Sequence, residues 1–381
     1  MPASNSLQPF TGEKREQTQL GGPRGDIRGF NSQALGAIAS SDDFNLNIQY
    51  APRTNGAGYV FRLELTPKSG VRFKRIAQNY FFLIDRSHSI KNQRYDLTKM
   101  AVSKALTMLH PGDTFNVLLF DDTVEAVAKY NMPWNPINVQ NAQAFLSKQH
   151  NGGMFSTTDL YSSLGKIIPS AVAETEVNTA ILLSDGDTFL KPDKQREMIA
   201  NWTRQNTGKV SLYSIAAGKG NNLALLDLLS VFNKGNLTYT AAEKGIESTL
   251  FKLIQAIRNP IGKDITVSTI TKVAGVQIGV YPPNAFLPNL YENSPFVVYG
   301  TINRLSDFHV FFQGRYYDKY LDIKQLVSFE KGRPGDPMAL EKKLAMQMAY
   351  KNYDQYLKDN NTAHLENAKQ LLQMYQIPVV F

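Results

Sequence analysis

Apolar runs that end in polar residues constrain the fold of this chain more than any other feature. The first run extends from Asn79 to Asp85, and similar runs cover residues 115–120 and 179–183. Strands of this kind are typical of a parallel sheet that is buried on both faces. Residues 97–109 and 160–168 lie between them and have helical apolar spacing. This alternation predicts an α/β class domain with a doubly wound parallel sheet.

The sequence changes character on both sides of this domain. Residues 44–67 form two alternating runs around Asn55-Gly56, which predicts a β-hairpin. After Asn259-Pro260, short alternating stretches up to residue 312 indicate a β-rich unit. Helical spacing then returns in residues 338–375, and residues 377–381 resemble a strand.

We therefore divide the chain into four predicted parts. They are a flexible tail over 1–38, a β-rich, sandwich-like domain built from 40–76 and 261–332, a doubly wound domain over 77–259 inserted into it, and a C-terminal helical hairpin over 335–381.

Composition excludes several classes of function. The net charge is +8, but the basic residues cluster only at 68–75, so the sequence does not indicate a nucleic-acid-binding protein. The chain has no cysteine, which excludes disulfides and thiolate metal sites. No apolar run reaches the roughly 18 residues of a transmembrane helix. Met1–Phe10 shows no signal peptide, so the protein stays inside the cell or the chain begins after a removed segment.

Short polar side chains follow the predicted strands where these end. Asp85, Ser87 and Ser89 alternate along one loop, Thr158 opens a predicted helix, and Asp185 follows a later strand. The carboxyl ends of parallel strands converge on one crevice in an open α/β sheet. A cluster of hydroxyls and carboxylates there suits Mg²⁺ or Mn²⁺. The alternative is that Asp85 and Ser87 only cap turns.

This set of residues resembles the metal-ion-dependent adhesion site (MIDAS) of von Willebrand factor A (VWA) domains, whose pattern is Asp-x-Ser-x-Ser, then a distant Thr and a distant Asp. The resemblance implies that Ser87 and Ser89 bind a metal ion directly and that Thr158 binds it directly or through water. Asp85 and Asp185 would hold coordinated waters. The implied cofactor is Mg²⁺, with Mn²⁺ or Ca²⁺ as alternatives, and an exposed Asp or Glu of a protein partner would complete the site.

The resemblance also implies which residues would contact that partner. They are Arg86, His88, Thr157 and Asp187, of which we expect Arg86 and His88 to be exposed. The family usually has Gly at position 88. The segment before Thr158 is longer than usual, which leaves Thr157 as a rival ligand.

A wider resemblance covers about residues 57–381. Residues 58–67, 281–291 and 297–300 are similar to the inter-alpha-trypsin inhibitor heavy chain type of protein, in which a VWA domain is inserted into a β-sandwich. The resemblance favours an extracellular, cell-surface or periplasmic location, while the missing signal peptide leaves a cytoplasmic one open.

Three functions follow from these observations. The first is a cation-dependent adhesion or assembly module without enzymatic activity, and the second is a metal-independent scaffold with a degenerate site. The third is a phosphotransferase of the haloacid dehalogenase type, which needs a second Asp where Ser87 stands. A serine hydrolase is disfavoured because the chain lacks a Gly-x-Ser-x-Gly elbow.

Overall fold

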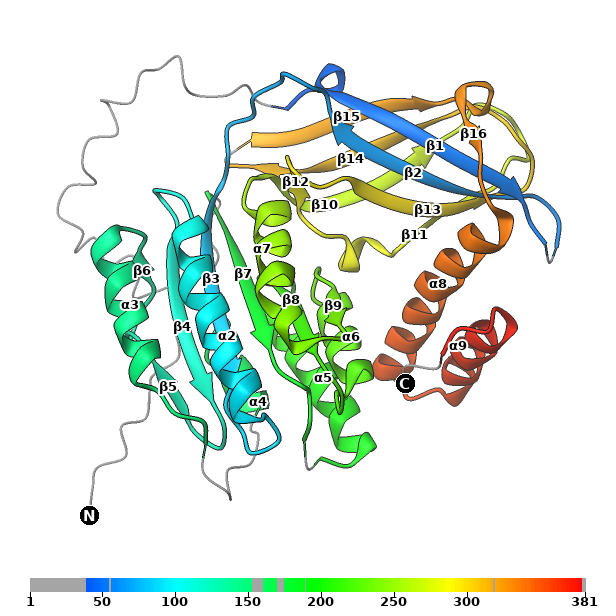
Figure 1. Ribbon diagram of the computed structural model, residues 1–381. Helices are drawn as coiled ribbons and strands as arrows, with labels where there is room; N and C mark the ends of the chain where they lie inside the picture. Colours follow the sequence, from blue (N-terminus) through cyan, green and yellow to red (C-terminus); the bar gives the residue numbers. More distant parts are fainter. Residues whose placement is uncertain are drawn as a thin grey trace. The chain divides into compact units, whose positions relative to one another are not determined.

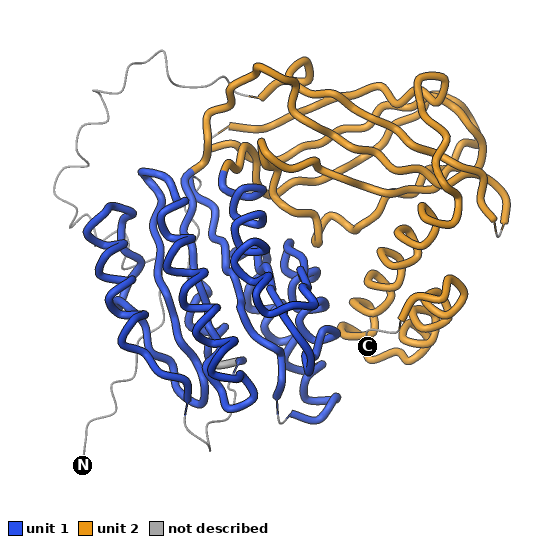
Figure 2. Tube along the Cα trace, in the orientation of Figure 1, with its two compact units in different colours: residues 1–34, 77–258 blue, residues 35–76, 259–381 orange. Residues whose placement is uncertain are grey.

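The chain forms two compact units (Figure 2). Among the described residues, the first extends from Ala77 to Arg258, and the second joins residues 39–76 to those from Asn259 onwards. The computed structural model describes residues 39–54, 56–152, 160–169, 175–188, 190–317 and 319–378. The tail predicted for residues 1–38 lies outside the described residues.

The first unit contains a mainly parallel sheet of seven strands (Figure 1). Its strand order is β5-β4-β3-β7-β8-β9, and the short β6 pairs with β4. The strands are β3 (Ala77–Asp85), β4 (Thr114–Phe120), β5 (Val124–Ala126), β6 (Met132–Pro133), β7 (Glu176–Leu183), β8 (Val210–Ala217) and β9 (Leu237–Thr240). Strand β3 lies between β4 and β7, so the chain leaves it first in one direction and then returns on its other side. The polar end of β3 therefore lies at the topological switch point.

Helices cover both faces of this sheet. Helices α3, α2 and α7 pack side by side on one face, and α4, α5 and α6 pack on the other (Figure 1). Their bounds are α2 (Asn92–Ala105), α3 (Pro136–Lys148), α4 (Leu160–Gly165), α5 (Pro192–Asn206), α6 (Leu223–Val231) and α7 (Ile246–Ile257), with 3-10 turns at Leu106–Met108 and Glu243–Gly245. The predicted doubly wound α/β architecture is thus confirmed.

Burial explains why these segments are strands. Every residue of β3 from Gln78 to Asp85 is buried, as is all of β8. Polar groups inside the sheet are paired across strands: Asn79 Nδ2 donates to Asn178 Oδ1 at 2.9 Å, and the Thr179 hydroxyl donates to Gln78 Oε1 at 2.9 Å. Such pairing avoids the cost of a buried polar group without a partner.

The second unit is a β-sandwich with two sheets. One sheet has the order β11-β13-β2-β1-β16 and the other β12-β10-β14-β15. The strands are β1 (Phe44–Pro52), β2 (Tyr59–Pro67), β10 (Pro260–Ile270), β11 (Ile278–Tyr281), β12 (Leu290–Tyr291), β13 (Phe296–Ile302), β14 (Phe308–Tyr316), β15 (Lys319–Val327) and β16 (Arg333–Pro334), with 3-10 turns η3 (Ser41–Asp43), η6 (Asn284–Phe286) and η7 (Phe329–Lys331). Strands β1 and β2 pair antiparallel along their whole length, which confirms the predicted hairpin.

Aromatic side chains join the two sheets. The ring of Phe61 on β2 lies 5.7 Å from that of Phe308 on β14, and the rings of Phe296 and Phe312 are 5.8 Å apart. Phe329 on η7 packs edge-on against Phe61 at 6.4 Å. These contacts bury the inner faces of both sheets and make the core of the sandwich.

Two helices complete the second unit. Asp336 caps the N-terminus of helix α8 (Pro337–Asp359), because its carboxylate accepts bonds from the amides of Met338 and Ala339. Helix α9 (Thr362–Met374) packs against α8. Leu340 and Leu344 of α8 cover Ala51 and Val60 on the outer face of the five-stranded sheet. The helical hairpin is confirmed as a pair of packed helices.

The strand expected over 377–381 is not observed in its described part. Gln376 lies in a turn and residues 377–378 form neither helix nor strand, while 379–381 lie outside the described residues. Among the described residues no helix combines the length and the apolar character needed to cross a membrane.

Candidate metal site

The structure brings the two acidic ends of β3 and β7 together. The strands are neighbours, with Ile84 paired to Leu183, so Asp85 and Ser184 emerge side by side. The Ser184 hydroxyl donates to Asp85 Oδ2 at 2.6 Å, and the Ser87 amide donates to Asp85 Oδ1 at 2.9 Å. Asp85 is therefore held in one orientation at the switch point of the sheet.

The predicted ligands of this cluster differ in their exposure to solvent. Asp85, Ser87 and Asp185 are almost fully buried, whereas Ser89 is exposed. The hydroxyl oxygens of Ser87 and Ser89 lie 3.1 Å apart, and Asp185 Oδ1 accepts a bond from the Asp187 amide at 2.9 Å. The cluster thus has a buried floor and one side that opens to solvent.

Burial disfavours the charged forms of the Asp85 and Asp185 carboxyl groups. It raises the pKa of Asp85 from 3.8 to about 6, and hydrogen bonds from Ser184 and Ser87 only partly oppose this. Burial also raises the pKa of Asp185, against the amide bond from Asp187 and the positive charge of Arg94. Two desolvated carboxyls that favour protonation are a fitting environment for a hard divalent cation, which would stabilise their charged forms.

The described residues fit such an ion in ligand type but do not make an all-carboxylate cage. Within these residues, no three His, Cys, Asp or Glu side chains come together as a metal-binding group. Hydroxyls and two carboxyls of one small cluster are instead the oxygen set that Mg²⁺ accepts while it keeps several waters.

Two of the predicted site residues cannot be placed. Thr157 and Thr158 lie in the segment 153–159, outside the described residues. The chain before this segment lies at the site, because the Gly152 amide donates to the Arg86 carbonyl at 2.8 Å.

The exposure expected for Arg86 is wrong. Its side chain is only 13% exposed and pairs with Asp121 at 3.0 Å and with Glu125 at 2.9 Å. Asp121 lies in the turn after β4, and Glu125 lies on β5. Because β4 is the neighbour of β3, these two acids reach the Arg86 guanidinium and balance its charge. His88, in contrast, is exposed as predicted, and Asp187 is exposed as well.

Arg94 is a site residue that the sequence reasoning missed. It lies on α2, is 6% exposed, and its Nη2 donates to the Ser184 carbonyl at 3.1 Å and to Asn221 Oδ1 at 2.9 Å. The signal in the sequence is helical spacing, because Arg94 is in phase with the buried Thr98 and Ala101. The arginine supplies a positive charge close to both aspartates.

The role of Arg94 can be tested by substitution. We expect Arg94→Met to lower the free energy of unfolding without metal by about 2–4 kcal/mol, because the buried carboxyls lose their counter-charge. The increase in melting temperature caused by Mg²⁺ should become larger than in the parent protein, since the metal no longer competes with a resident cation. Arg94→Lys is the control that keeps the charge. Equal Mg²⁺-induced shifts in all three proteins would contradict this role.

The raised pKa of Asp85 predicts the pH dependence of the metal-free protein. Between pH 3.8 and about 6 the folded state keeps a proton that the unfolded state releases. Stability should therefore fall as pH rises through this range, by up to about 3 kcal/mol at 1.36 kcal/mol per pKa unit. Urea unfolding followed by the fluorescence of Trp134 and Trp202, both in the first unit, measures it. Asp85→Asn should flatten the slope, and Asp193→Asn, at an exposed site, should not.

Comparison with known proteins agrees with this architecture. A solved structure described as von Willebrand factor type A from Catenulispora acidiphila superposes with a TM-score of 0.56 at 15% identity, covering 91% of this chain and 89% of that one. The fold is therefore that of a VWA-domain protein. No protein-family model matches the chain.

Sequence comparison adds a more specific relationship. The chain is 24% identical over 270 residues to human inter-alpha-trypsin inhibitor heavy chain H1, covering 67% of this chain and 28% of the relative. It is 23% identical over 199 residues to the bovine H1 chain, covering 50% and 22%. The chain is thus similar to these heavy chains but spans only about a quarter of their length.

Proposed function

We propose that this protein is a divalent-cation-dependent protein-binding module, serving adhesion or assembly, that captures an acidic side chain of its partner. The observation that carries this proposal is the cluster of Asp85, Ser87, Ser89 and Asp185 at the switch point between β3 and β7. Its ligand type, its order along the chain and its one open side all suit a MIDAS.

The proposed roles of the residues follow from the resemblance to a MIDAS. Ser87 and Ser89 would bind Mg²⁺, or Mn²⁺ or Ca²⁺, directly, and the buried Asp85 and Asp185 would hold its waters. Thr158, or its neighbour Thr157, would supply a further hydroxyl. The metal would act as a Lewis acid that binds a carboxylate oxygen of an Asp or Glu on the partner. His88 and Asp187, which are exposed, would contact the partner.

A binding role fits these residues better than a catalytic one. Ser87 occupies the position at which a phosphotransferase of the haloacid dehalogenase type needs its second Asp. A nucleophilic role for Asp85 would also require an exposed carboxylate, and Asp85 is 2% exposed with both oxygens engaged. An adhesive role suits an extracellular, cell-surface or periplasmic location, which fractionation of cells with an antibody would test.

Selection of peptides on the 381-residue protein tests the proposed function. A displayed random-peptide library is bound in Mg²⁺ and eluted with EDTA, and the eluted peptides should be enriched in exposed Asp or Glu. Replacing that acid with Asn or Gln should abolish binding. Identical peptides eluting from Asp85→Ala, or peptides without any acid, would overturn the proposal.

The metal-free scaffold is a second candidate that one observation favours. Arg94 already supplies a positive charge beside Asp85 and Asp185, as a bound metal would. In that case the same selection in Mg²⁺ and in EDTA would recover the same peptides.

A further inference from the structure

A polar groove lies on the second unit, on the open side of the sandwich. Its volume is about 430 Å³, and residues 46–49 of β1 form one wall while residues 326–328 at the end of β15 form the other. Arg62 and Glu64 of β2, Lys331 of η7 and Arg333 of β16 complete the lining. A groove of this size can hold a short peptide or a small ligand.

Both walls of the groove are edges of sheets. Strand β1 has β2 on one side along its whole length, but on the other side β16 pairs only with Gln49 and Tyr50. Within the described part of the chain, residues 44–48 therefore have a paired strand on one side only, while β15 and η7 also contact β1. Strand β15 is the last strand of its sheet, and η3 contacts it, where the Lys324 amide donates to the Ser41 hydroxyl at 2.9 Å. Edges of this kind can accept another strand.

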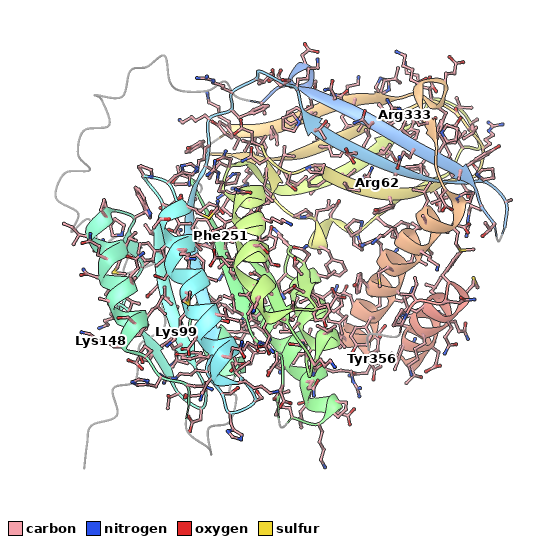
Figure 3. The ribbon with its side chains drawn as sticks, in the orientation of Figure 1. Arg62, Lys99, Lys148, Phe251, Arg333 and Tyr356 are labelled. Atoms are coloured by element: carbon pink, nitrogen blue, oxygen red, sulfur yellow. The ribbon has the colours of Figure 1, made fainter. Side chains whose placement is uncertain are left out.

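The groove has an excess of positive charge. Arg62, Gln49 and Arg333 are register partners on three adjacent strands, so their side chains share one face of the sheet. Figure 3 labels Arg62 and Arg333, which lie on β2 and β16. Glu64 is the acid in the lining and it is paired with Arg62. Lys331 and Arg333 are exposed and have no ion-pair partner within the described part of the chain. Two basic groups are thus free to meet a ligand.

We propose that this groove binds an acidic peptide segment in extended conformation, which adds as a strand to the free edge of β1. Backbone hydrogen bonds to residues 44–48 would supply affinity, and the acidic side chains would pair with Lys331 and Arg333. Gln49 already pairs with β16, so the other three residues of β1 in the lining, which span about 10 Å, leave room for about three residues of the peptide. This surface belongs to the second unit and does not depend on the candidate metal site.

Fluorescence anisotropy with a labelled peptide of eight alternating Val and Glu residues tests the proposal. The titration uses the 381-residue protein with Asp85→Ala in EDTA, so that capture of glutamate by a metal ion makes no contribution. We expect binding that weakens as salt increases. A Val-Lys peptide should not bind, and neither should the Val-Glu peptide with alternate backbone amides methylated, since it cannot pair as a strand.

Charge reversal locates the binding site. The double variant Lys331→Glu with Arg333→Glu should weaken binding about tenfold or more, because two attractions become repulsions. The matched control is Lys272→Glu with Lys319→Glu, which changes the same charge at exposed positions elsewhere in the second unit. Equal affinity in both double variants, or equal binding of the methylated peptide, would overturn the proposal. So would dimerisation of the peptide-free protein that the first double variant abolishes, because a second copy would then be the occupant.

Discussion

Titration of Mg²⁺ into the metal-stripped protein should release or absorb heat that saturates at one ion per chain, and Asp85→Ala should weaken this binding strongly. The buried carboxylate, oriented by Ser184 and Ser87, would hold the waters of the ion. Loss of such an outer-shell group lowers metal affinity about 10- to 100-fold. Mg²⁺ at a hundred times its dissociation constant should stabilise the parent protein by about 2.7 kcal/mol.

The controls separate metal binding from loss of structure. Asp85→Asn keeps the shape of the side chain and should also lose affinity, while Asp193→Ala, at an exposed site on α5, should bind like the parent. Thermal unfolding followed by tryptophan fluorescence reports the first unit, where both tryptophans lie. No heat and no change in melting temperature with Mg²⁺, Mn²⁺ or Ca²⁺ would favour the metal-free scaffold.

The second large effect concerns the sandwich. Phe61→Ala should lower the free energy of unfolding of the second unit by about 3–5 kcal/mol, because it leaves a cavity between the sheets. Phe61 is fully buried and its ring contacts those of Phe308 and Phe329. It also fills the space that Gly300 leaves open, since a Cβ there would lie 2.2 Å from the ring.

Urea unfolding followed by far-ultraviolet circular dichroism measures this loss. Tyr320→Ala is the control, because its side chain is 86% exposed and such surface changes usually stay within about 0.5 kcal/mol. A loss for Phe61→Ala no larger than that of the control would contradict the sandwich core described above.

Long apolar runs were the part of the fold that could be predicted best. Strands β3, β4 and β7 begin and end within a few residues of the predicted runs, because burial on both faces leaves an unbroken apolar signal. Helix α3 and strand β15 were not singled out, since each has one polar face and a mixed sequence. Their place depends on the neighbour they cover and not on local pattern alone.

The candidate site shows the same division between local and distant information. Asp85, Ser87 and Ser89 could be grouped from the sequence because they alternate along one loop after a buried strand. Arg86 lies in the same loop, yet its ion pairs with Asp121 and Glu125 are made across the sheet. A local sequence pattern cannot predict such contacts, because the paired residues lie more than thirty positions apart in the chain.

By itself, the sequence determined the α/β class of the first unit, its two acidic strand ends and the hairpin that begins the sandwich, because periodicity and burial are properties of short segments. Only the tertiary structure decided that Asp85 and Ser184 are neighbours, that Arg94 lies close to them, and that Arg86 is already paired. It also decided the basic groove beside β1, which residues 46 and 333 build together. These features depend on which strands become neighbours, and strand order is set by packing of the whole chain.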